Sequence, residues 1–317
     1  MQAYLFVHFR ERKTPDGEQV YFGLSRDGFH WEAVNDGRPV LWSVLGEKGV
    51  RDCTIIRCKT DGKYRIFATD LSLAYNFRRK YHFNWPTVSR NGSKCLAMWE
   101  SDDLLTWTEQ KLLPLGNEDF GCLWAPDVFY DPEFDDYVLH WSSCHAHNGY
   151  GNMGIWFTRT KDFQTFTEPK LLYQKTDAGI IDSAIYVEDG LYFLFVKCDH
   201  DPERILLLQA AHAEGPYCRV EAFDRSMLEI EAGLYEGPTA CRLQDGRWCL
   251  FLDYYGVPGD GQGYVPFLAD TLRSGVFIRA DQEFSFPYGY KHGTVIPITT
   301  DTYDAIRQHD WSQRDWQ

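Results

Sequence analysis

The sequence predicts an all-β fold, a five-bladed β-propeller, from the spacing of five apolar, strand-like runs. Four of these runs begin with a carboxylate and the fifth with a histidine: Asp52, Asp127, Asp182, Glu236 and His292. The steps between these residues are 75, 55, 54 and 56 positions. A period of this size with one strand signature per unit is typical of a ring of small sheets. If each run is the innermost strand of a blade, all five leading residues share one phase and point toward one axial pocket.

A second strand is predicted in four of the units, because a turn signal is followed by a β-rich run. The turns are Asp61-Gly62, Asp135-Asp136, Asp189-Gly190 and Asp245-Gly246. Asp-Gly between two β-rich runs is the strongest short signal for a hairpin. The aromatic content of 16% suits sheets that pack face to face. We therefore expect the first two strands of each blade to form a hairpin.

An outer hairpin is predicted from a second repeated pattern. Residues 99–108 are echoed by residues 156–167, and residues 23–31 match the same pattern near the start of the chain. Only residues 4–9 precede that first copy, so we expect the last blade to be completed by both chain ends, which hides the sheet edges. Residues 1–317 then form a single catalytic domain. Helices are few, and the best is expected near residues 303–309 with Thr302 as its N-cap.

Composition limits the partners and the compartment. The net charge of −14 argues against nucleic acid and anionic membranes and favours a neutral or cationic ligand. The nine cysteines include no Cys-x-x-Cys pair, and several lie in predicted strands, so we interpret them as buried free thiols of a reducing compartment. The first ten residues lack a basic leader, and no apolar run could span a bilayer. These features predict a cytoplasmic protein.

The leading carboxylates indicate acid–base chemistry. Paired carboxylates across a sugar are the minimal machinery of glycoside hydrolysis, in which one group must be neutral and the other ionised. Asp182 is flanked by apolar residues, a dry setting that raises the pKa of a carboxyl group. Gly237-Pro238 fixes the backbone after Glu236. Taken singly, each carboxylate could be a strand-end or turn residue, and nearby aromatics that suit sugar rings could be blade core: Trp124, Trp141, Tyr254 and Tyr255.

The chain resembles glycoside hydrolase family 43, whose members are five-bladed β-propellers that act with inversion. The resemblance covers nearly the whole chain and is carried by five motifs in order: Gly49-Val50-Arg51-Asp52, Trp124-Ala125-Pro126-Asp127, Ile181-Asp182-Ser183-Ala184, Glu236-Gly237-Pro238 and His292-Gly293-Thr294-Val295. Residues 4–9, 19–28 and 68–71 resemble intracellular, exo-acting α-L-arabinofuranosidases of that family. The chain departs from the family at Cys53, where proline usually follows the base aspartate.

The resemblance implies a role for each motif residue. Asp52 is expected to be the general base, Glu236 the general acid, and Asp182 the residue that orients Glu236 and raises its pKa. The residues expected to contact substrate are Asp127, Trp124, Asp70, Ser183, His147 and Tyr255. His292 matches an axial histidine that binds a calcium ion in many relatives, although the chemistry requires no cofactor. The implied function is release of terminal α-L-arabinofuranosyl residues from small arabino-oligosaccharides, with α-1,5 linkage expected. Separately from the resemblance, a homo-oligomer is the expected protein partner.

Several alternatives remain open at this stage. β-D-xylosidase activity is the nearest, because arabinofuranose and xylopyranose present similar hydroxyl patterns. A non-catalytic sugar-binding propeller would keep the aromatics and could lose the acid. A glycoside phosphorylase would need gathered cations, for which the candidates are Arg51, Lys197 and Arg279. His145-Ala146-His147 could ligate zinc if both rings lay on one face of a strand, but no third ligand is evident and a loop over the pocket fits better.

Overall fold

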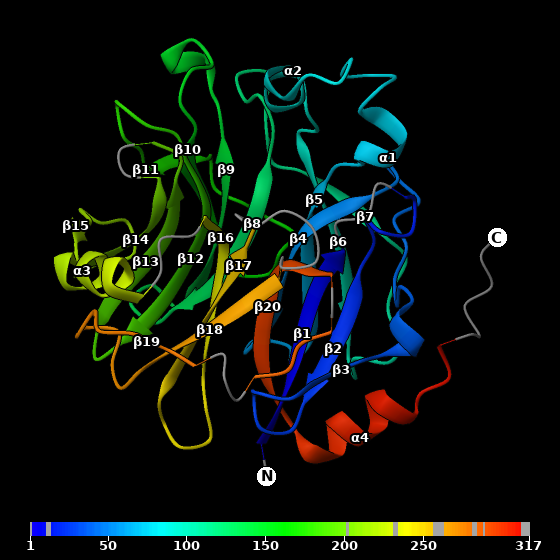
Figure 1. The fold of residues 1–317 in the computed structure, drawn as a ribbon. Coiled ribbons are helices and arrows are strands. Elements are labelled where there is room, and N and C mark those ends of the chain that lie inside the picture. Colours follow the sequence, from blue (N-terminus) through cyan, green and yellow to red (C-terminus); the bar gives the residue numbers. More distant parts are fainter. Residues whose placement is uncertain are drawn as a thin grey trace.

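The computed structural model describes residues 2–10, 14–200, 203–230, 234–255, 263–280, 284–287 and 289–311. Its strands form five four-stranded antiparallel sheets (Figure 1). The innermost strands touch one another in a closed order, β4 to β8, β12, β16, β20 and back to β4. This arrangement is a five-bladed β-propeller, so the predicted fold class is confirmed.

Four blades follow one another along the chain, each from its inner to its outer strand. The first contains β4 (Val50–Arg57), β5 (Tyr64–Asp70), β6 (Cys95–Ser101) and β7 (Lys111–Pro114). The second contains β8 (Trp124–Asp131), β9 (Asp136–Ser143), β10 (Gly154–Thr160) and β11 (Lys170–Tyr173). The third contains β12 (Ile180–Glu188), β13 (Leu191–Cys198), β14 (Arg204–Ala210) and β15 (Cys218–Arg219). The fourth contains β16 (Tyr235–Arg242), β17 (Trp248–Tyr254), β18 (Gly263–Ala269) and β19 (Ile278–Arg279).

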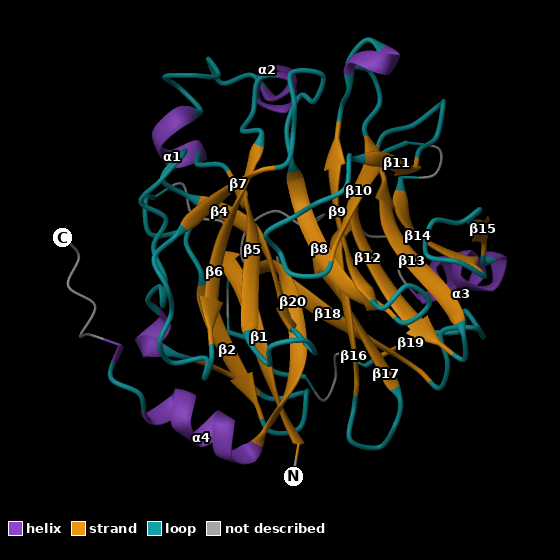
Figure 2. Ribbon diagram, turned by 180° about the vertical axis from the view of Figure 1, so that it is seen from behind, coloured by secondary structure: helices purple, strands orange, loops and turns teal. Residues whose placement is uncertain are grey.

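The fifth blade combines strands from the beginning and the end of the described chain. Its order is β20 (Tyr290–Thr299), β1 (Gln2–Arg10), β2 (Tyr21–Ser25) and β3 (Trp31–Ala33). β20 and β1 are antiparallel, with Gln2 opposite Thr299 and His8 opposite Gly293. Figure 2 shows these two strands side by side, with the N-terminal end near α4. Pairing of these strands removes two exposed sheet edges.

The helices are short and lie outside the blades. They are α1 (Leu73–Asn76), α2 (Trp85–Arg90), α3 (Glu221–Ile230) and α4 (Thr300–Gln308), with 3₁₀ turns η1 (Asn35–Gly37) and η2 (Ala146–Asn148). The predicted C-terminal helix is present, but its predicted cap is wrong. Thr299, not Thr302, is the N-cap, because its hydroxyl oxygen accepts a hydrogen bond from the Thr302 N–H at 3.1 Å. No helix in the described ranges is long and apolar enough to cross a membrane.

The repeated outer pattern marks a turn, and the strand after the turn begins within the pattern only in the first copy, where β2 and β3 pair from Ser25 and Trp31 onward. In three blades a hydroxyl at the end of the third strand accepts from the N–H three residues later: Ser25 from Gly28, Ser101 from Leu104 and Thr160 from Phe163. In the blade that begins with β4, the outermost strand is β7, beyond the predicted residues 99–108, and Trp107 forms only an isolated bridge to Ser101. In the blades that begin with β4 and β8, the pattern therefore identified the turn and placed the outer strand too early.

A β-bulge interrupts four of the inner strands at the same level. The residues at the bulge that adopt a positive φ are Asp52 (52°), Ala125 (47°), Asp182 (54°) and Gly237 (55°). A bulge bends the strand and re-aims a side chain. The predicted common phase of the carboxylates is therefore wrong in detail. Asp52 and Asp182 occupy the bulge itself, whereas Glu236 precedes it by one residue and Asp127 follows it by two.

The core lies between the faces of neighbouring blades and supports these inner strands. Its largest fully buried side chains include Trp99, Trp141, Phe67, Phe193 and Phe195. Seven of the nine cysteines are buried and all nine are free, as the predicted buried thiols require. The packed aromatic faces hold the inner strands at a fixed distance from the axis. The bulge residues can therefore keep a positive φ, a strained conformation that Asp tolerates better than most residues.

Candidate active site

The described structure brings Asp52, Asp182 and His292 together on the axis. His292, on β20, places its Nδ1 3.4 Å from Asp52 Oδ1 and 3.9 Å from Asp182 Oδ2. The three side chains are 17%, 11% and 13% exposed. The site is therefore dry enough to perturb pKa values and still open to a ligand. A Cβ at Gly237 would lie 2.7 Å from the His292 ring, so the close approach of β16 to this ring requires glycine.

Asp52 is held as an ionised carboxylate. Its Oδ2 accepts a hydrogen bond from Thr69 Oγ1 at 2.9 Å. Burial acts to raise the pKa of Asp52, but the hydrogen bond and charge of His292 outweigh it, together with Arg51, so its pKa lies below the usual value. His292 gains in return, because the two aspartates overcome burial and raise its pKa to about 9. At neutral pH the pair is an imidazolium next to a carboxylate that is able to accept a proton.

Asp182 is held by hydrogen bonds to both neighbouring blades. Its N–H donates to Ser142 Oγ at 3.0 Å, and its Oδ2 accepts from the Gly237 N–H at 3.2 Å. Gly237 directly follows Glu236, so this bond ties Asp182 to the segment that carries the candidate acid. Burial is the largest influence on Asp182 and raises its pKa, with the negative charge of Asp52 acting in the same direction and the charge of His292 opposing it.

Glu236 differs from Asp52 in its protonation. Burial comes first among the causes that raise the pKa of Glu236 to about 8, followed by the negative charge of Asp253. Asp182 contributes in the same direction but less than Asp253, which is the stronger of the two neighbours and was not predicted. Asp253 lies directly across the strand pair from Glu236 and is fully buried. The sequence signal that could have indicated Asp253 is its position on β17, the predicted hairpin partner of the strand that carries Glu236.

A buried lysine, also missed from the sequence, lies between these two acids. Lys291 Nζ lies 3.5 Å from Glu236 Oε1 and 2.8 Å from Asp253 Oδ2. Its side chain is 3% exposed, whereas that of Glu236 is 29% exposed. Lys291 lowers the pKa of Glu236 while Asp253 raises it. The buried ion pair of Lys291 and Asp253 therefore lies next to the carboxyl group of Glu236, which is the most exposed of the three side chains.

Three predicted substrate-contacting residues lie around this centre. Asp127 Oδ1 accepts from Thr54 Oγ1 at 2.6 Å, and burial raises the Asp127 pKa to about 6. Trp124 is half-buried at the start of β8. Tyr255 accepts a hydrogen bond from the buried Lys197, and the negative charge of Glu236 contributes to the raised pKa of Tyr255 after burial. These residues extend the cluster toward the blades that begin with β8 and β16.

The other three predicted contact residues are engaged with the protein itself. Asp70 is 3% exposed and accepts from the Glu47 N–H at 2.8 Å and Ser93 Oγ at 2.7 Å. Ser183 Oγ lies 2.7 Å from the buried His140 Nδ1. His147 is exposed in η2, and its Nδ1 lies 3.1 Å from that of His145. Their contact with substrate stays a prediction.

Neither predicted metal position has a ligand set for direct coordination. Across the described ranges, no group of three His, Cys, Asp or Glu side chains could hold a metal ion. The Nδ1 of His292 faces two carboxylates, and a pKa of about 9 keeps the ring protonated, so it acts as a cation there. His145 and His147 are not on one strand, because His145 caps η2. The calcium ion on the axis stays a prediction, and no step below depends on it.

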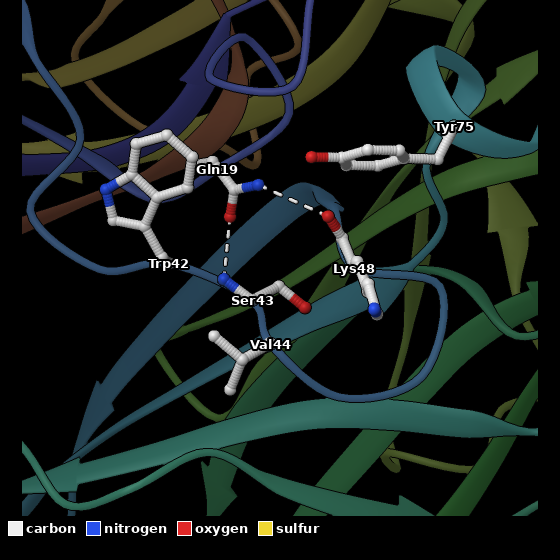
Figure 3. A pocket seen from close by; sticks show the side chains of 6 residues that line it. All are labelled: Gln19, Trp42, Ser43, Val44, Lys48 and Tyr75. Carbon is white, nitrogen blue, oxygen red and sulfur yellow. Dashed lines mark hydrogen bonds between the residues drawn. The ribbon is translucent and has the colours of Figure 1, made fainter. Parts of the chain in front are cut away.

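A separate pocket of about 400 Å³ opens beside α1 (Figure 3). Gln19 forms its floor, accepting from the Ser43 N–H at 2.7 Å and donating to the Lys48 carbonyl at 3.3 Å. Figure 3 shows the hydroxyl end of Tyr75 pointing toward Gln19, with Trp42 on the other side. Glu18, the neighbour of Gln19, forms a buried ion pair at 3.1 Å with Arg51, the neighbour of Asp52. Glu18, Arg51 and Asp52 do not line the pocket. The pocket is thus a neighbour of the carboxylate cluster and not part of it.

The chain matches a known protein family over almost its whole length. Residues 1–304 match the model of a family related to glycoside hydrolase family 43 and described as a probable glycosyl hydrolase domain. The chain belongs to this family. A curated relative, an α-L-arabinofuranosidase from Bifidobacterium longum subsp. longum, is 28% identical over 215 residues. That match spans 62% of this chain and 19% of the relative, so the chain corresponds to a small part of that larger protein.

Solved structures with low sequence identity to this chain share its fold. A family-43 protein from Bacillus licheniformis superposes with a TM-score of 0.58 at 15% identity, covering 91% of this chain and 54% of that one. An exo-β-1,3-galactanase from Phanerochaete chrysosporium, crystallised with galactose, superposes with a TM-score of 0.59 at 13% identity, covering 88% and 60%. At these identities the likeness concerns the propeller and not the substrate, which must be inferred from the site.

Proposed function

We propose that this chain is an inverting, exo-acting glycoside hydrolase that releases terminal α-L-arabinofuranosyl residues from small arabino-oligosaccharides with α-1,5 linkage. The arrangement that carries the proposal is the cluster of carboxyl groups around His292, in which Asp52 contacts the imidazole ring and Glu236 lies beside the Gly237 N–H that Asp182 holds. Asp52 has a lowered pKa, whereas Glu236 has a pKa raised to about 8. Pairs of carboxyl groups whose environments separate their pKa values are typical acid–base partners. The arabinofuranosidase relative supports the choice of sugar.

The proposed reaction is a single displacement. Asp52 accepts a proton from a water molecule as the water oxygen attacks the anomeric carbon. The bond from that carbon to the leaving oxygen breaks, and the leaving oxygen takes the proton of Glu236. His292 keeps Asp52 ionised before the reaction. Asp182 holds the Gly237 N–H beside Glu236 and, with Asp253, disfavours a second negative charge there. An inverting enzyme requires about 6.5–9.5 Å between acid and base, the space that a water molecule needs.

The test is an assay of the purified protein on p-nitrophenyl α-L-arabinofuranoside, p-nitrophenyl β-D-xyloside and arabino-oligosaccharides. We expect hydrolysis of the arabinosides from the non-reducing end, one sugar at a time. A higher kcat/KM on the xyloside would replace the proposed sugar with xylose and leave the acid–base roles in place. Absence of hydrolysis on all three, from a protein whose near-ultraviolet circular dichroism shows it to be folded, would refute the proposed activity. The cytoplasmic location and the homo-oligomer remain predictions.

A further inference from the structure

Residues 71–94 form an insertion at the end of the blade where the carboxylates lie. β5 ends at Asp70 and β6 begins at Cys95, and the residues between them contain α1 and α2. Thr69, the neighbour of Asp70, donates to Asp52 at 2.9 Å, so the insertion begins at the edge of the site. Figure 1 shows α1 and α2 at the opposite end of the molecule from α4. A ligand that extends out of the site over this blade would meet residues 71–94.

A row of aromatic rings connects this insertion with the site. The ring centroids of Phe77 and Phe83 are 5.6 Å apart, those of Phe77 and Trp85 are 5.3 Å apart, and those of Trp85 and Trp124 are 6.2 Å apart. Phe83 is 65% exposed and Trp85 is 46% exposed. The residue after Trp124, Ala125, donates its N–H to Thr69 Oγ1 at 2.8 Å. Ring contacts from Phe83 to Trp124, the peptide bond to Ala125 and the hydrogen bonds of Thr69 therefore connect the surface with Asp52.

Exposed apolar side chains are concentrated in one stretch of the chain that includes the insertion. Within the described ranges, five of the ten large apolar side chains that are exposed lie between residues 44 and 85: Val44, Leu45, Tyr75, Phe83 and Trp85. Exposed apolar groups that occur singly need no explanation, but a concentration beside a site indicates a binding surface. Tyr75 belongs to α1 and lines the pocket of Figure 3. Exposed apolar side chains therefore occur both in α1, at Tyr75, and after it, at Phe83 and Trp85.

The insertion also carries a charge opposite to that of the whole protein. Residues 71–94 contain five Lys or Arg and no Asp or Glu, whereas the chain has 46 acidic and 32 basic residues. Three of these cations are engaged within the protein: Lys80 with Glu47, Arg90 over the Tyr150 ring and Lys94 with the Gly121 carbonyl. Arg78 and Arg79 are exposed, and neither has a partner among the residues that the structure describes.

The two arginines belong to the same small unit as the aromatic row. They lie in a turn that is closed by a hydrogen bond of 2.7 Å from the Phe83 N–H to the Phe77 carbonyl, and the rings of these two residues are in contact. The net charge of −14 predicts a neutral or cationic ligand for the protein as a whole. The turn reverses that expectation locally, because it presents two guanidinium groups beside flat, exposed rings.

We propose that residues 77–85, together with Trp124, bind the leaving-group part of a sugar chain that carries uronic acid carboxylates. This inference rests on the proposed glycosidase function and specifies its substrate class. The rings offer flat faces for the C–H groups of sugars, and Arg78 or Arg79 pairs with a uronate carboxylate through a planar, two-pronged geometry. The reacting sugar stays neutral at the carboxylate cluster, and the acidic sugar lies beyond it, where repulsion from Asp52 and Asp182 is weaker.

The experiment measures binding in a variant that does not consume the ligand. Asp52→Asn protein is titrated calorimetrically with a neutral arabino-oligosaccharide and with one of equal length that carries a glucuronic acid. We expect about fivefold tighter binding of the acidic sugar at low salt, and loss of that preference in 1 M NaCl. Adding Arg78→Ala and Arg79→Ala should remove the preference and leave the neutral sugar unaffected. Adding Trp85→Ala should weaken binding of both sugars by about tenfold.

A matched control removes two exposed arginines elsewhere. Arg225→Ala with Arg273→Ala makes the same change in net charge on or near the fourth blade, and it should keep the preference. Equal binding of the two sugars, or equal loss in both double variants, would overturn the inference. Concentration-dependent self-association that Trp85→Ala abolishes, without an effect on sugar binding, would assign the surface to a second copy of the chain and also overturn it. Because binding is measured without turnover, failure of the proposed hydrolysis would be seen separately.

Discussion

Replacement of Lys291 by methionine tests how the candidate acid is kept at the right protonation. Lys291 Nζ lies 3.5 Å from Glu236 Oε1, and its positive charge favours the ionised form of that carboxyl group. Methionine has a similar length and no charge. The pKa of Glu236 should therefore rise above its value of about 8 in Lys291→Met. Since the reaction needs protonated Glu236, the alkaline limb of the kcat/KM profile should move to higher pH.

The size of the shift follows from the distances. Two unit charges 3.5 Å apart interact by about 5 kcal/mol at an effective dielectric constant of about 20. Lys291 is also 2.8 Å from Asp253, whose opposite charge cancels much of this field, and Glu236 is 29% exposed to water. We expect a net effect of about 1.4 to 2.7 kcal/mol, which corresponds to a rise of about one to two pKa units.

The assay is kcat/KM against pH on arabinobiose, whose leaving group needs the proton of Glu236, with the released arabinose measured after quenching. Lys291→Arg is the matched control, because it keeps the charge, and its alkaline limb should stay near the wild-type position. Circular dichroism and urea titration monitor the loss of the buried Lys291–Asp253 pair, since an unpaired buried charge destabilises a fold. An alkaline limb that stays in place or moves to lower pH in folded Lys291→Met would refute the reasoning.

Further expectations concern single residues. Asp52→Ala should lose activity on every substrate. Glu236→Ala should lose about 10²–10⁴-fold in activity on arabinobiose. Its loss should be smaller on p-nitrophenyl arabinoside, because that leaving group needs little protonation. Equal losses on both would show the acid to be wrongly assigned. Asp182→Asn should move the alkaline limb to lower pH, because it removes a negative charge near Glu236; an upward shift would contradict its role. Dialysis against EDTA should leave kcat/KM unchanged, because the two proposed proton transfers use only Asp52 and Glu236; loss of activity that added Ca²⁺ restores would disprove this. Phe193→Ala, at a fully buried position, should lower the free energy of unfolding by about 3–5 kcal/mol in urea titration, and a change below 1 kcal/mol would contradict tight packing there.

The blade repeat could be predicted because its signals are local. Carboxylates at strand starts and Asp-Gly turns recur with the blade period, and they place β4, β8, β12 and β16 within a few residues of their observed starts. The phase of the carboxylates could not be predicted. A bulge at Asp52 or Asp182 inserts one residue into a strand. It changes the direction in which the leading side chain points, and the apolar pattern of the strand does not reveal it.

The surroundings of Glu236 were less predictable than the residue itself. Lys291 and Asp253 come from β20 and β17, and their approach to Glu236 depends on strand register and on the closure of the ring. A buried lysine beside an axial histidine has no signal in a single sequence. Thr69 and Thr54 likewise look like ordinary strand residues, and only the fold brings them to Asp52 and Asp127.

The most direct test of the proposed mechanism is the anomeric configuration of the first product. Proton NMR is recorded within seconds to minutes of adding enzyme to α-1,5-arabinotriose, before mutarotation mixes the anomers. With Asp52 activating water and Glu236 protonating the leaving oxygen, the first arabinofuranose to appear should be the β anomer, with the α anomer rising later. Initial release of the α anomer would show retention, place a nucleophile where we place a base, and contradict the proposed mechanism.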